Sequence, residues 1–324
     1  MFAEAIEDIL KDQCTPAVVR AIEAGGSPHT LWEAFEGNGF LELLAPEAKG
    51  GAGLSLPELF PVLCAFGRYT VPVPVAQTIV ARALLASHTL PRGMVTFAVA
   101  LHQSAQGAIC CPLTPYGMVA DYVLAQDGDA LLLLPTALAS RQSTGVQRSQ
   151  VATLTWPDAR NAIRFSDAGA GLPIFAAALY AALLSGAMAR VFEMTLQYCN
   201  DRVQFGKSLG KFQAVQHQLS VMAEHTAAAS IAAEAAFRTG ASAPSLLAAA
   251  IAKSRTSEAA ALVSSTAHAL HGAIGVTEEY DLQLLTRRLH EWRMAHGSEA
   301  CWNLVVGQSV LASNLPLVDF VRTV

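Results

Sequence analysis

The sequence contains few charged residues, and this scarcity excludes several classes of protein. Only 15% of its 324 residues are Asp, Glu, Lys or Arg, whereas 52% are hydrophobic, and its mean hydropathy is +0.36. Such a composition is not typical of disordered or fibrous proteins. Because 26 acidic residues outnumber 21 Lys and Arg, for a net charge of −5, no overall positive field attracts a nucleic acid. We therefore expect two or three globular units that do not bind nucleic acid.

Long uninterrupted apolar runs and a secretory signal are also lacking. The longest apolar run, residues 172–188, contains Ser185 and Gly186, and its helical pattern continues into Arg190 and Glu193. This pattern predicts a buried helix and no membrane span. The chain begins MFAEAIEDIL, which is acidic where a secretory signal is basic, and no apolar segment follows. We therefore expect a cytoplasmic protein.

Common cysteine and catalytic motifs are absent as well. The six cysteines form no CxxC pair or zinc-finger spacing, which predicts reduced, buried thiols. The sequence has no GxSxG elbow and no HExxH helix. The GAG at 169–171 lacks the third Gly of a dinucleotide fingerprint, and the GKS at 206–208 has Asp201 where a phosphate-binding loop has its first Gly. No carboxylate or Cys pair accompanies His268 and His271, so we predict no metal site.

Hydrophobic periodicity divides the chain into three regions. Residues 1–90 show helical spacing broken by Gly, Pro and Ser clusters, residues 91–168 contain short runs rich in Val, Leu and Thr, and residues 169–324 form Ala-rich helical stretches. The Asp127-Gly128 pair predicts a hairpin in the middle region. We expect a mainly α protein with a helical N-terminal domain, a reduced and mostly antiparallel middle β domain, and a C-terminal four-helix bundle.

Two polar segments interrupt the C-terminal helices. Residues 198–217 combine an Arg, two Phe and two Gly, and residues 270–279 contain His-Gly-Ala-Ile-Gly. A solvated turn between helices would explain either segment alone. However, Arg suits bidentate contact with a phosphate, Phe can pack against a flat ring, and Gly permits close approach of the backbone. The first segment therefore also suits a cofactor that contains pyrophosphate.

Together the two segments resemble the paired C-terminal motifs of the acyl-CoA dehydrogenase family. The first reads RVQFGKSLGKFQAVQH from Arg202 to His217, and the second reads HGAIGVTE from His271 to Glu278. The resemblance implies that family's fold, FAD as cofactor and a CoA thioester as substrate. It further implies α,β-dehydrogenation, in which the flavin accepts a hydride, and an electron-transfer flavoprotein-type acceptor.

The resemblance also implies which residues contact the cofactor. In the family, the first motif reaches across a subunit interface to the neighbour's FAD, and the second motif lies beside that same cofactor. The implied cofactor-binding residues of this chain are Arg202, Gln204, Phe205, Leu209, Phe212, Gln213, His271, Gly272 and Gly275. Oligomerisation is therefore expected to be part of the site.

The sequence departs from the family at the catalytic base and in the middle domain. The family's usual Glu position reads His296, and a second position that some members use reads Ala176. Because the α-proton of a thioester is weakly acidic, a positioned base is needed. His296 could serve, whereas Glu299 lies on the following turn. In the middle domain, only residues 108–115 and the Thr-Trp-Pro at 155–157 stand for the family's flavin-holding segments.

Three hypotheses follow from these departures. The first is a subunit of a hetero-oligomeric dehydrogenase that completes the FAD site of a partner chain, which owns the Glu. The second is a self-sufficient homo-oligomer that uses His296 or an unrecognised carboxylate. The third is a non-catalytic helical scaffold that has lost FAD. Short family members of the first kind are associated with bulky thioesters such as steroid side chains, so the resemblance allows steroid as well as fatty acid degradation.

Overall fold

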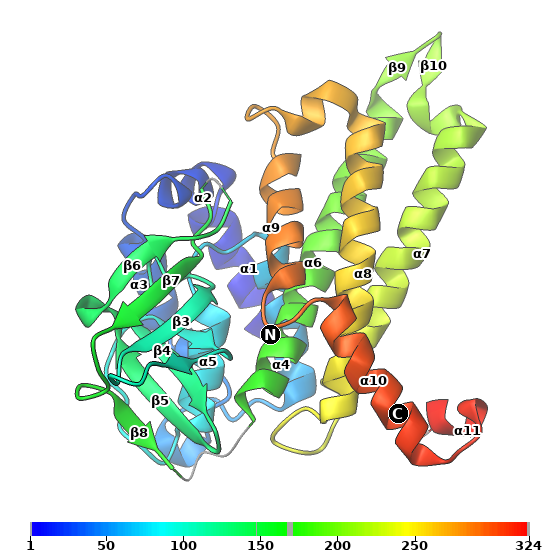
Figure 1. Cartoon of the computed structure of the whole chain (residues 1–324). Coiled ribbons are helices and arrows are strands. Elements are labelled where there is room, and N and C mark those ends of the chain that lie inside the picture. Colours follow the sequence, from blue (N-terminus) through cyan, green and yellow to red (C-terminus); the bar gives the residue numbers. More distant parts are fainter. Residues whose placement is uncertain (1, 147, 167–170, 323–324) are drawn as a thin grey trace.

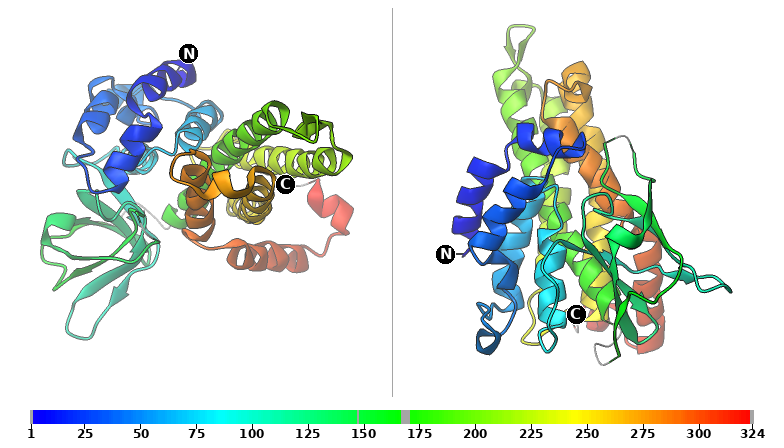
Figure 2. Two further views of the ribbon diagram at one scale, coloured as in Figure 1. Left: turned by 90° about the horizontal axis from the view of Figure 1, so that it is seen from above. Right: turned by 90° about the vertical axis from the view of Figure 1, so that its left-hand side faces the viewer.

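Helices at both ends of the chain flank a small β region in this computed structural model (Figure 1). The structure describes residues 2–146, 148–166 and 171–322. Seen from above, the N-terminal helices and the β region lie on one side and the C-terminal helices lie on the other (Figure 2). The expected order of helix, sheet and helix is therefore confirmed.

The N-terminal region consists of five α-helices and two short 3-10 helices. Their bounds are α1 Phe2–Gln13, α2 Pro16–Glu23, α3 His29–Gly37, η1 Phe40–Glu42, η2 Glu47–Lys49, α4 Leu56–Arg68 and α5 Val75–Leu84. Local sequence explains where two of these helices begin. Thr15 caps α2 by accepting a hydrogen bond from the Val18 amide, and Ser55 and Glu58 form a capping box at α4.

The described residues of the middle region form two four-stranded sheets. One has the order β1-β4-β5-β8 and the other β2-β3-β7-β6, and every pair is antiparallel except β1 with β4. The bounds are β1 Val95–Ala98, β2 His102–Gln103, β3 Ile109–Thr114, β4 Tyr122–Asp127, β5 Ala130–Pro135, η3 Thr136–Leu138, β6 Ser140–Ser143, β7 Ala152–Trp156 and β8 Ile163–Phe165. Buried residues from both sheets form a separate small core.

The predicted hairpin is present in this region. Asp127 pairs with Ala130, and Gly128 between them has a φ of +59°, a conformation that glycine adopts without strain. Strand β6 was not predicted. Its sequence, Ser-Arg-Gln-Ser, has no alternation of apolar and polar residues, because all four side chains are exposed and none packs in the core.

The C-terminal region is a bundle of long helices. Its elements are α6 Leu172–Asp201, β9 Val203–Gln204, β10 Lys207–Ser208, η4 Leu209–Lys211, α7 Gln213–Ala235, α8 Leu246–His271, η5 Gly272–Val276, α9 Leu282–Met294, α10 Glu299–Ser313 and α11 Leu317–Val321. The last helix, α11, was not predicted. Residues 167–168 at the predicted domain boundary and Gly169 and Ala170 of the GAG stretch lie outside the described residues.

Small residues allow α4 and α6 to pack backbone against backbone. A Cβ added to Gly67 would lie 2.0 Å from the Leu183 carbonyl oxygen, and one added to Gly186 would lie 1.9 Å from that of Cys64. The apolar run that begins at residue 172 therefore belongs to the central helix of the fold.

Two helices are apolar and long enough to cross a membrane by length and composition alone. They are α6, of whose apolar window 83% is buried, and the segment Leu246–Val276, with 39% buried. The burial of α6 is that of a core helix, as the sequence predicted.

The cysteines differ in part from the expectation of buried thiols. All six are free, but Cys301 is exposed, and Cys64 and Cys110 are only partly buried. Exposure of Cys301 is explained by its position in the first turn of α10, whose only buried residue is the neighbouring Trp302.

Candidate functional site

A cavity of about 850 Å³ lies between the β region and α9. Its volume is within the range of small-molecule sites, about 300–1,000 Å³. Residues 97–100 and 112–115 form a largely apolar wall on the sheet side, and residues 276 to 297 form the opposite wall with Gln283, Arg287, His290, Glu291 and Met294. The cavity therefore suits a ligand that has an apolar body and some polar groups.

Helix α9 separates the cavity from the core. Residues 283, 287, 290, 291 and 294 share one helical face and line the cavity. Leu282, Leu285, Leu289 and Trp292 on the other face are buried. Polar residues at helical spacing directly after the second motif were a signal for this wall that our sequence reasoning missed.

Lys253 anchors the turn that carries His296. Its fully buried ammonium group donates hydrogen bonds to the carbonyl oxygens of Trp292 (3.1 Å) and Arg293 (2.7 Å) at the end of α9, and to the Ser257 hydroxyl (2.9 Å). All three donors are thereby satisfied. Burial lowers the pKa of Lys253 to about 7.

His296 lines the cavity but lacks the character of a strong base. Its Nε2 atom is buried with no hydrogen-bond partner among the described residues, and its ring packs 4.9 Å from that of Tyr180. Burial and the nearby positive charge of Lys253 lower the pKa of His296 to about 3. An imidazole with so low a pKa is poorly matched to abstraction of a weakly acidic proton.

The other two candidate base positions lie outside the cavity. Ala176 is fully buried inside α6 and does not line it. Glu299 is likewise absent from the lining and accepts a 3.0 Å hydrogen bond from Arg293 Nε. The structure therefore brings neither residue to the position of a base.

Glu291 is a cavity carboxylate that sequence reasoning missed. One of its oxygens accepts a 2.8 Å hydrogen bond from Arg288, and the other accepts a short hydrogen bond from Ser149 in the β6–β7 loop. Both oxygens are therefore already engaged by other groups of the chain.

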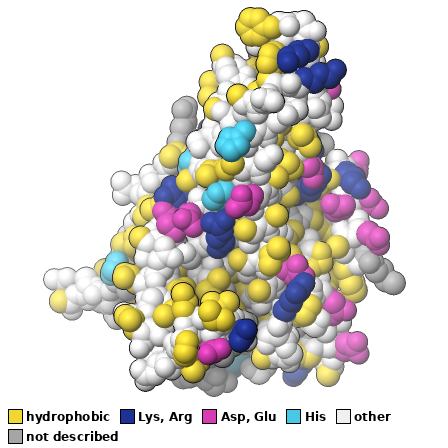
Figure 3. Space-filling view, turned by 90° about the vertical axis from the view of Figure 1, so that its right-hand side faces the viewer, with side chains coloured by type: hydrophobic (Ala, Val, Ile, Leu, Met, Phe, Trp, Pro, Cys, Tyr) yellow, Lys and Arg dark blue, Asp and Glu magenta, His cyan; other side chains and the backbone are white. Residues whose placement is uncertain are grey.

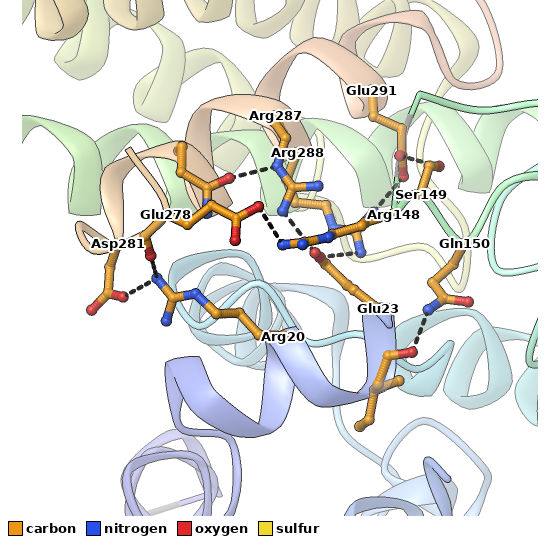
Figure 4. A network of polar contacts seen from close by, with 12 residues as sticks. Arg20, Glu23, Arg148, Ser149, Gln150, Glu278, Asp281, Arg287, Arg288 and Glu291 are labelled. Carbon is orange, nitrogen blue, oxygen red and sulfur yellow. Dashed lines mark hydrogen bonds and ion pairs between the residues drawn. The ribbon is translucent and has the colours of Figure 1, made fainter. Parts of the chain in front are cut away.

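A network of charged side chains joins α9 to α2 (Figure 4), and it includes the cavity-lining residues Arg287 and Glu291. Glu23 at the end of α2 bonds both Arg287 and Arg288 at 2.7 Å, and Arg288 also bonds Glu291. Burial alone would lower the pKa of Arg288, but the charges of Glu291 and Glu23 raise it overall. The network thus fixes α9 to the N-terminal region.

The first polar segment forms a hairpin that extends beyond the end of the bundle (Figure 1). Strands β9 and β10 pair across Phe205 and Gly206, which both have positive φ, +51° and +79°. Phe205 is 92% exposed. Figure 3 shows basic and hydrophobic side chains together at this projecting end.

The implied cofactor residues of this segment are accessible. Arg202, Gln204 and Gln213 are exposed, and Leu209 and Phe212 are partly buried. The ring of Phe212 lies 6.4 Å from that of Phe205. No side-chain partner of Arg202 occurs among the described residues, and the segment from Arg202 to Gln213 does not line the cavity.

The second polar segment is held at the same end of the bundle. His271 is buried, its ring stacks on that of Tyr198 at 4.4 Å, and Tyr198 donates a hydrogen bond to its carbonyl oxygen. Because Tyr198 lies four residues before Arg202, the fold brings the two motifs together. Burial lowers the pKa of His271.

The turn at residues 271–276 is closely packed around Gly275, but it contains one buried polar atom that has no hydrogen-bond partner among the described residues. Gly272 has a φ of +65°, and a Cβ on Gly275 would lie 3.0 Å from that of His271. The Nε2 atom of His271 is buried and has no partner among the described residues. An unpaired buried atom of this kind fits a polar ligand at the turn. No cluster of three or more metal-binding side chains occurs in the described part of the chain.

Comparisons with known proteins show the family to which this chain is similar. Residues 1–90 match the family model for the acyl-CoA dehydrogenase N-terminal domain, and residues 175–311 match that for the acyl-CoA dehydrogenase C-terminal domain. The chain is 32% identical over 302 residues to acyl-CoA dehydrogenase IpdE2 of Mycolicibacterium smegmatis, covering 90% of this chain and 91% of that protein. IpdE2 of Mycobacterium tuberculosis is also 32% identical, with 90% of each chain covered.

Two solved structures share the fold over nearly the whole chain. The ChsE4-ChsE5 complex from Mycobacterium tuberculosis has a TM-score of 0.83 at 21% identity, covering 97% of this chain and 96% of that chain. A variant of the steroid acyl-CoA dehydrogenase Tcur3481-Tcur3483 has a TM-score of 0.81 at 26% identity, covering 96% of each chain.

Proposed function

Because this chain belongs to the acyl-CoA dehydrogenase family, we propose that it is one subunit of a hetero-oligomeric dehydrogenase and completes the FAD site of a partner chain. Family membership confirms the fold, FAD as the cofactor and the class of enzyme, an FAD-dependent oxidoreductase of acyl-CoA thioesters. The division of work between two chains is our proposal.

The position of the first motif carries this proposal. The segment from Arg202 to Gln213 projects from the end of the bundle and contributes nothing to the lining of the chain's own cavity. An exposed Arg with no side-chain partner in the described part of the chain and a 92% exposed Phe are side chains that a second molecule would cover. We infer that the covering molecule is a partner subunit with its FAD.

The relatives support a second chain as partner and a bulky acyl group. The ChsE4-ChsE5 structure is that of a complex, and the Tcur3481-Tcur3483 enzyme is described as a steroid acyl-CoA dehydrogenase. We extend both properties to this chain and propose that steroid side chains are more suitable substrates than simple fatty acyl chains.

Several described residues fit FAD. The guanidinium of Arg202 is free to bind a phosphate, Phe205 and Phe212 can cover a flat ring and exclude water, and the exposed Gly272 leaves open space beside the backbone. The unpaired Nε2 of His271 can hydrogen-bond a polar cofactor atom. When bound, FAD supplies the acceptor for the hydride from the β-carbon of the thioester.

The base for α-proton abstraction is assigned to the partner in this proposal. His296 is neutral and weakly basic, and both oxygens of Glu291 are engaged by Ser149 and Arg288. A self-sufficient enzyme would have to release Glu291 from these contacts. We therefore favour the hetero-oligomer over the homo-oligomer.

The FAD content of the purified protein tests the division between chains. We expect no FAD on the chain alone and about one FAD per pair of chains after co-expression with a partner of the same family, measured by absorbance and native mass. One FAD per chain in the protein purified alone would contradict the proposal. No FAD under either condition would instead support the scaffold hypothesis.

Replacing His296 tests which chain supplies the base that abstracts the α-proton. We expect His296→Ala to leave the turnover of the assembled complex nearly unchanged, because its imidazole is a poor base and the partner holds the Glu. Steady-state kinetics of the complex measures this. A loss of about a hundredfold or more, the usual scale for a general base, would make His296 the base instead.

Other properties follow from the proposal and the composition. We propose a cytoplasmic enzyme without a membrane span that does not bind nucleic acid and passes electrons to an electron-transfer flavoprotein-type acceptor. The six free cysteines, the burial of α6 and the net charge of −5 support the first three of these properties.

A further inference from the structure

Arg148 differs from the other charged residues at the cavity because its ion pair is exposed. Its guanidinium lies 2.8 Å from Glu278, and the two side chains are 35% and 69% exposed. Both residues line the cavity, and Figure 4 shows their ion pair. Arg148 also has a φ of +65°, a conformation that non-glycine residues adopt at some energetic cost and often at ligand sites.

The neighbouring Arg287 and Arg288 side chains are not available to bind an anionic ligand. Arg287 is bound by Glu23 and Gln283, and Arg288 is 3% exposed between Glu23 and Glu291. Arg148 has a single carboxylate partner among the described residues, and that carboxylate can rotate into water. An exposed ion pair contributes little to stability, so an anionic ligand displaces Glu278 at little cost.

The opposite wall of the cavity is apolar. It contains Pro112, Pro115 and the 63% exposed Leu113. A ligand that fills the cavity therefore contacts apolar groups along its body and meets a cation at Arg148. A bulky apolar molecule with an anionic end satisfies both walls.

We propose that Arg148 is an anion-binding residue of this cavity, and that Glu278 is its resting partner, exchanged for the oxyanion of an otherwise apolar ligand. The oxyanion is either a phosphate of CoA or a carboxylate on the acyl group. The proposal concerns this chain's own cavity and does not depend on which subunit supplies FAD or the base.

Substitutions of Arg148 and of Glu278 are expected to change the affinity for an anionic probe in opposite directions. In isothermal titration of the full chain, we expect Arg148→Gln to weaken binding of an anionic probe about tenfold, the loss of one charge-assisted hydrogen bond. Glu278→Gln removes the competing carboxylate and strengthens binding by up to about fivefold. The exposed Arg164–Asp127 pair outside the cavity provides matched controls, Arg164→Gln and Asp127→Asn, which leave the affinity unchanged.

Three probes distinguish the sources of the anion. CoA carries the phosphates, pantetheine lacks them, and cholate has a fused-ring body with a carboxylate. If Arg148→Gln weakens the binding of CoA but not that of pantetheine, the anion is a phosphate of CoA. If it weakens the binding of cholate, the anion is a carboxylate on the acyl group. The proposal is overturned if neither anionic probe binds the unsubstituted chain, if Arg148→Gln leaves both affinities unchanged, if Glu278→Gln weakens them, or if the control pair responds equally.

Discussion

Arg202→Ala is expected to weaken FAD binding by the assembled complex about 10-fold to 100-fold, while the bundle keeps its stability. A hydrogen bond to a charged group contributes about 1.5–3 kcal/mol, which corresponds to this range. In the chain alone, Arg202 is exposed and has no side-chain partner among the described residues. Its removal should therefore change the free energy of unfolding by less than about 0.5 kcal/mol. Fluorescence titration with FAD and urea unfolding measure the two effects.

The appropriate control is another exposed Arg of the same bundle. Arg238 lies beyond the far end of α7, is 68% exposed and pairs only with Glu234 among the described residues. Arg238→Ala should leave FAD affinity unchanged. If Arg202→Ala also leaves it unchanged, the phosphate role is excluded. If native mass shows that the subunits separate, Arg202 holds the interface rather than the cofactor.

A substitution of Phe205, a second residue of the hairpin, tests whether an uncharged contact with the cofactor contributes to FAD binding separately from the charge of Arg202. Phe205 is 92% exposed, so the isolated chain loses almost no packing when it is truncated. A stacking or covering role would nevertheless appear as weaker FAD binding in the complex. Together the two variants would show whether the hairpin acts through its cation, its ring or both.

Local sequence patterns were sufficient to predict most of the fold. Helix periodicity and the Asp127-Gly128 turn depend on residues close in sequence. The hairpin of the first motif was located, although its two short strands were not predicted. Strand β6 was missed because its polar residues show no hydrophobic alternation, and α11 was missed because its five residues are too few to show a helical period.

The chemistry of the cavity could not be predicted in the same way. The pKa of His296 depends on its burial and on Lys253, which approaches from a different helix. The contact between Arg288 and Glu23 joins residues 265 positions apart. Such pairs result from tertiary packing, and a single sequence does not show which distant charges meet. The family resemblance therefore pointed to His296 as a candidate, but only the structure showed what surrounds it.

The contact between Glu23 and Arg288 leads to the largest expected effect on stability. Their side chains are 1% and 3% exposed, and Glu23 is bound to Arg287 as well. Removing one partner leaves a buried charge insufficiently compensated, which typically costs about 3–5 kcal/mol. Because Glu291 still contacts Arg288, we expect Glu23→Ala to destabilise the chain by about 3 kcal/mol, at the lower end of that range.

Urea unfolding of two further variants shows whether this loss comes from the charge. Glu33→Ala, which removes an exposed carboxylate on α3, should cost less than about 0.5 kcal/mol. Glu23→Leu combined with Arg288→Met should recover much of the lost stability, because apolar pairs often replace buried ion pairs without loss. If Glu23→Ala proves as mild as Glu33→Ala, the network does not hold α9 in place. The cavity wall must then be positioned by the apolar face of α9 and by the hydrogen bonds from Lys253.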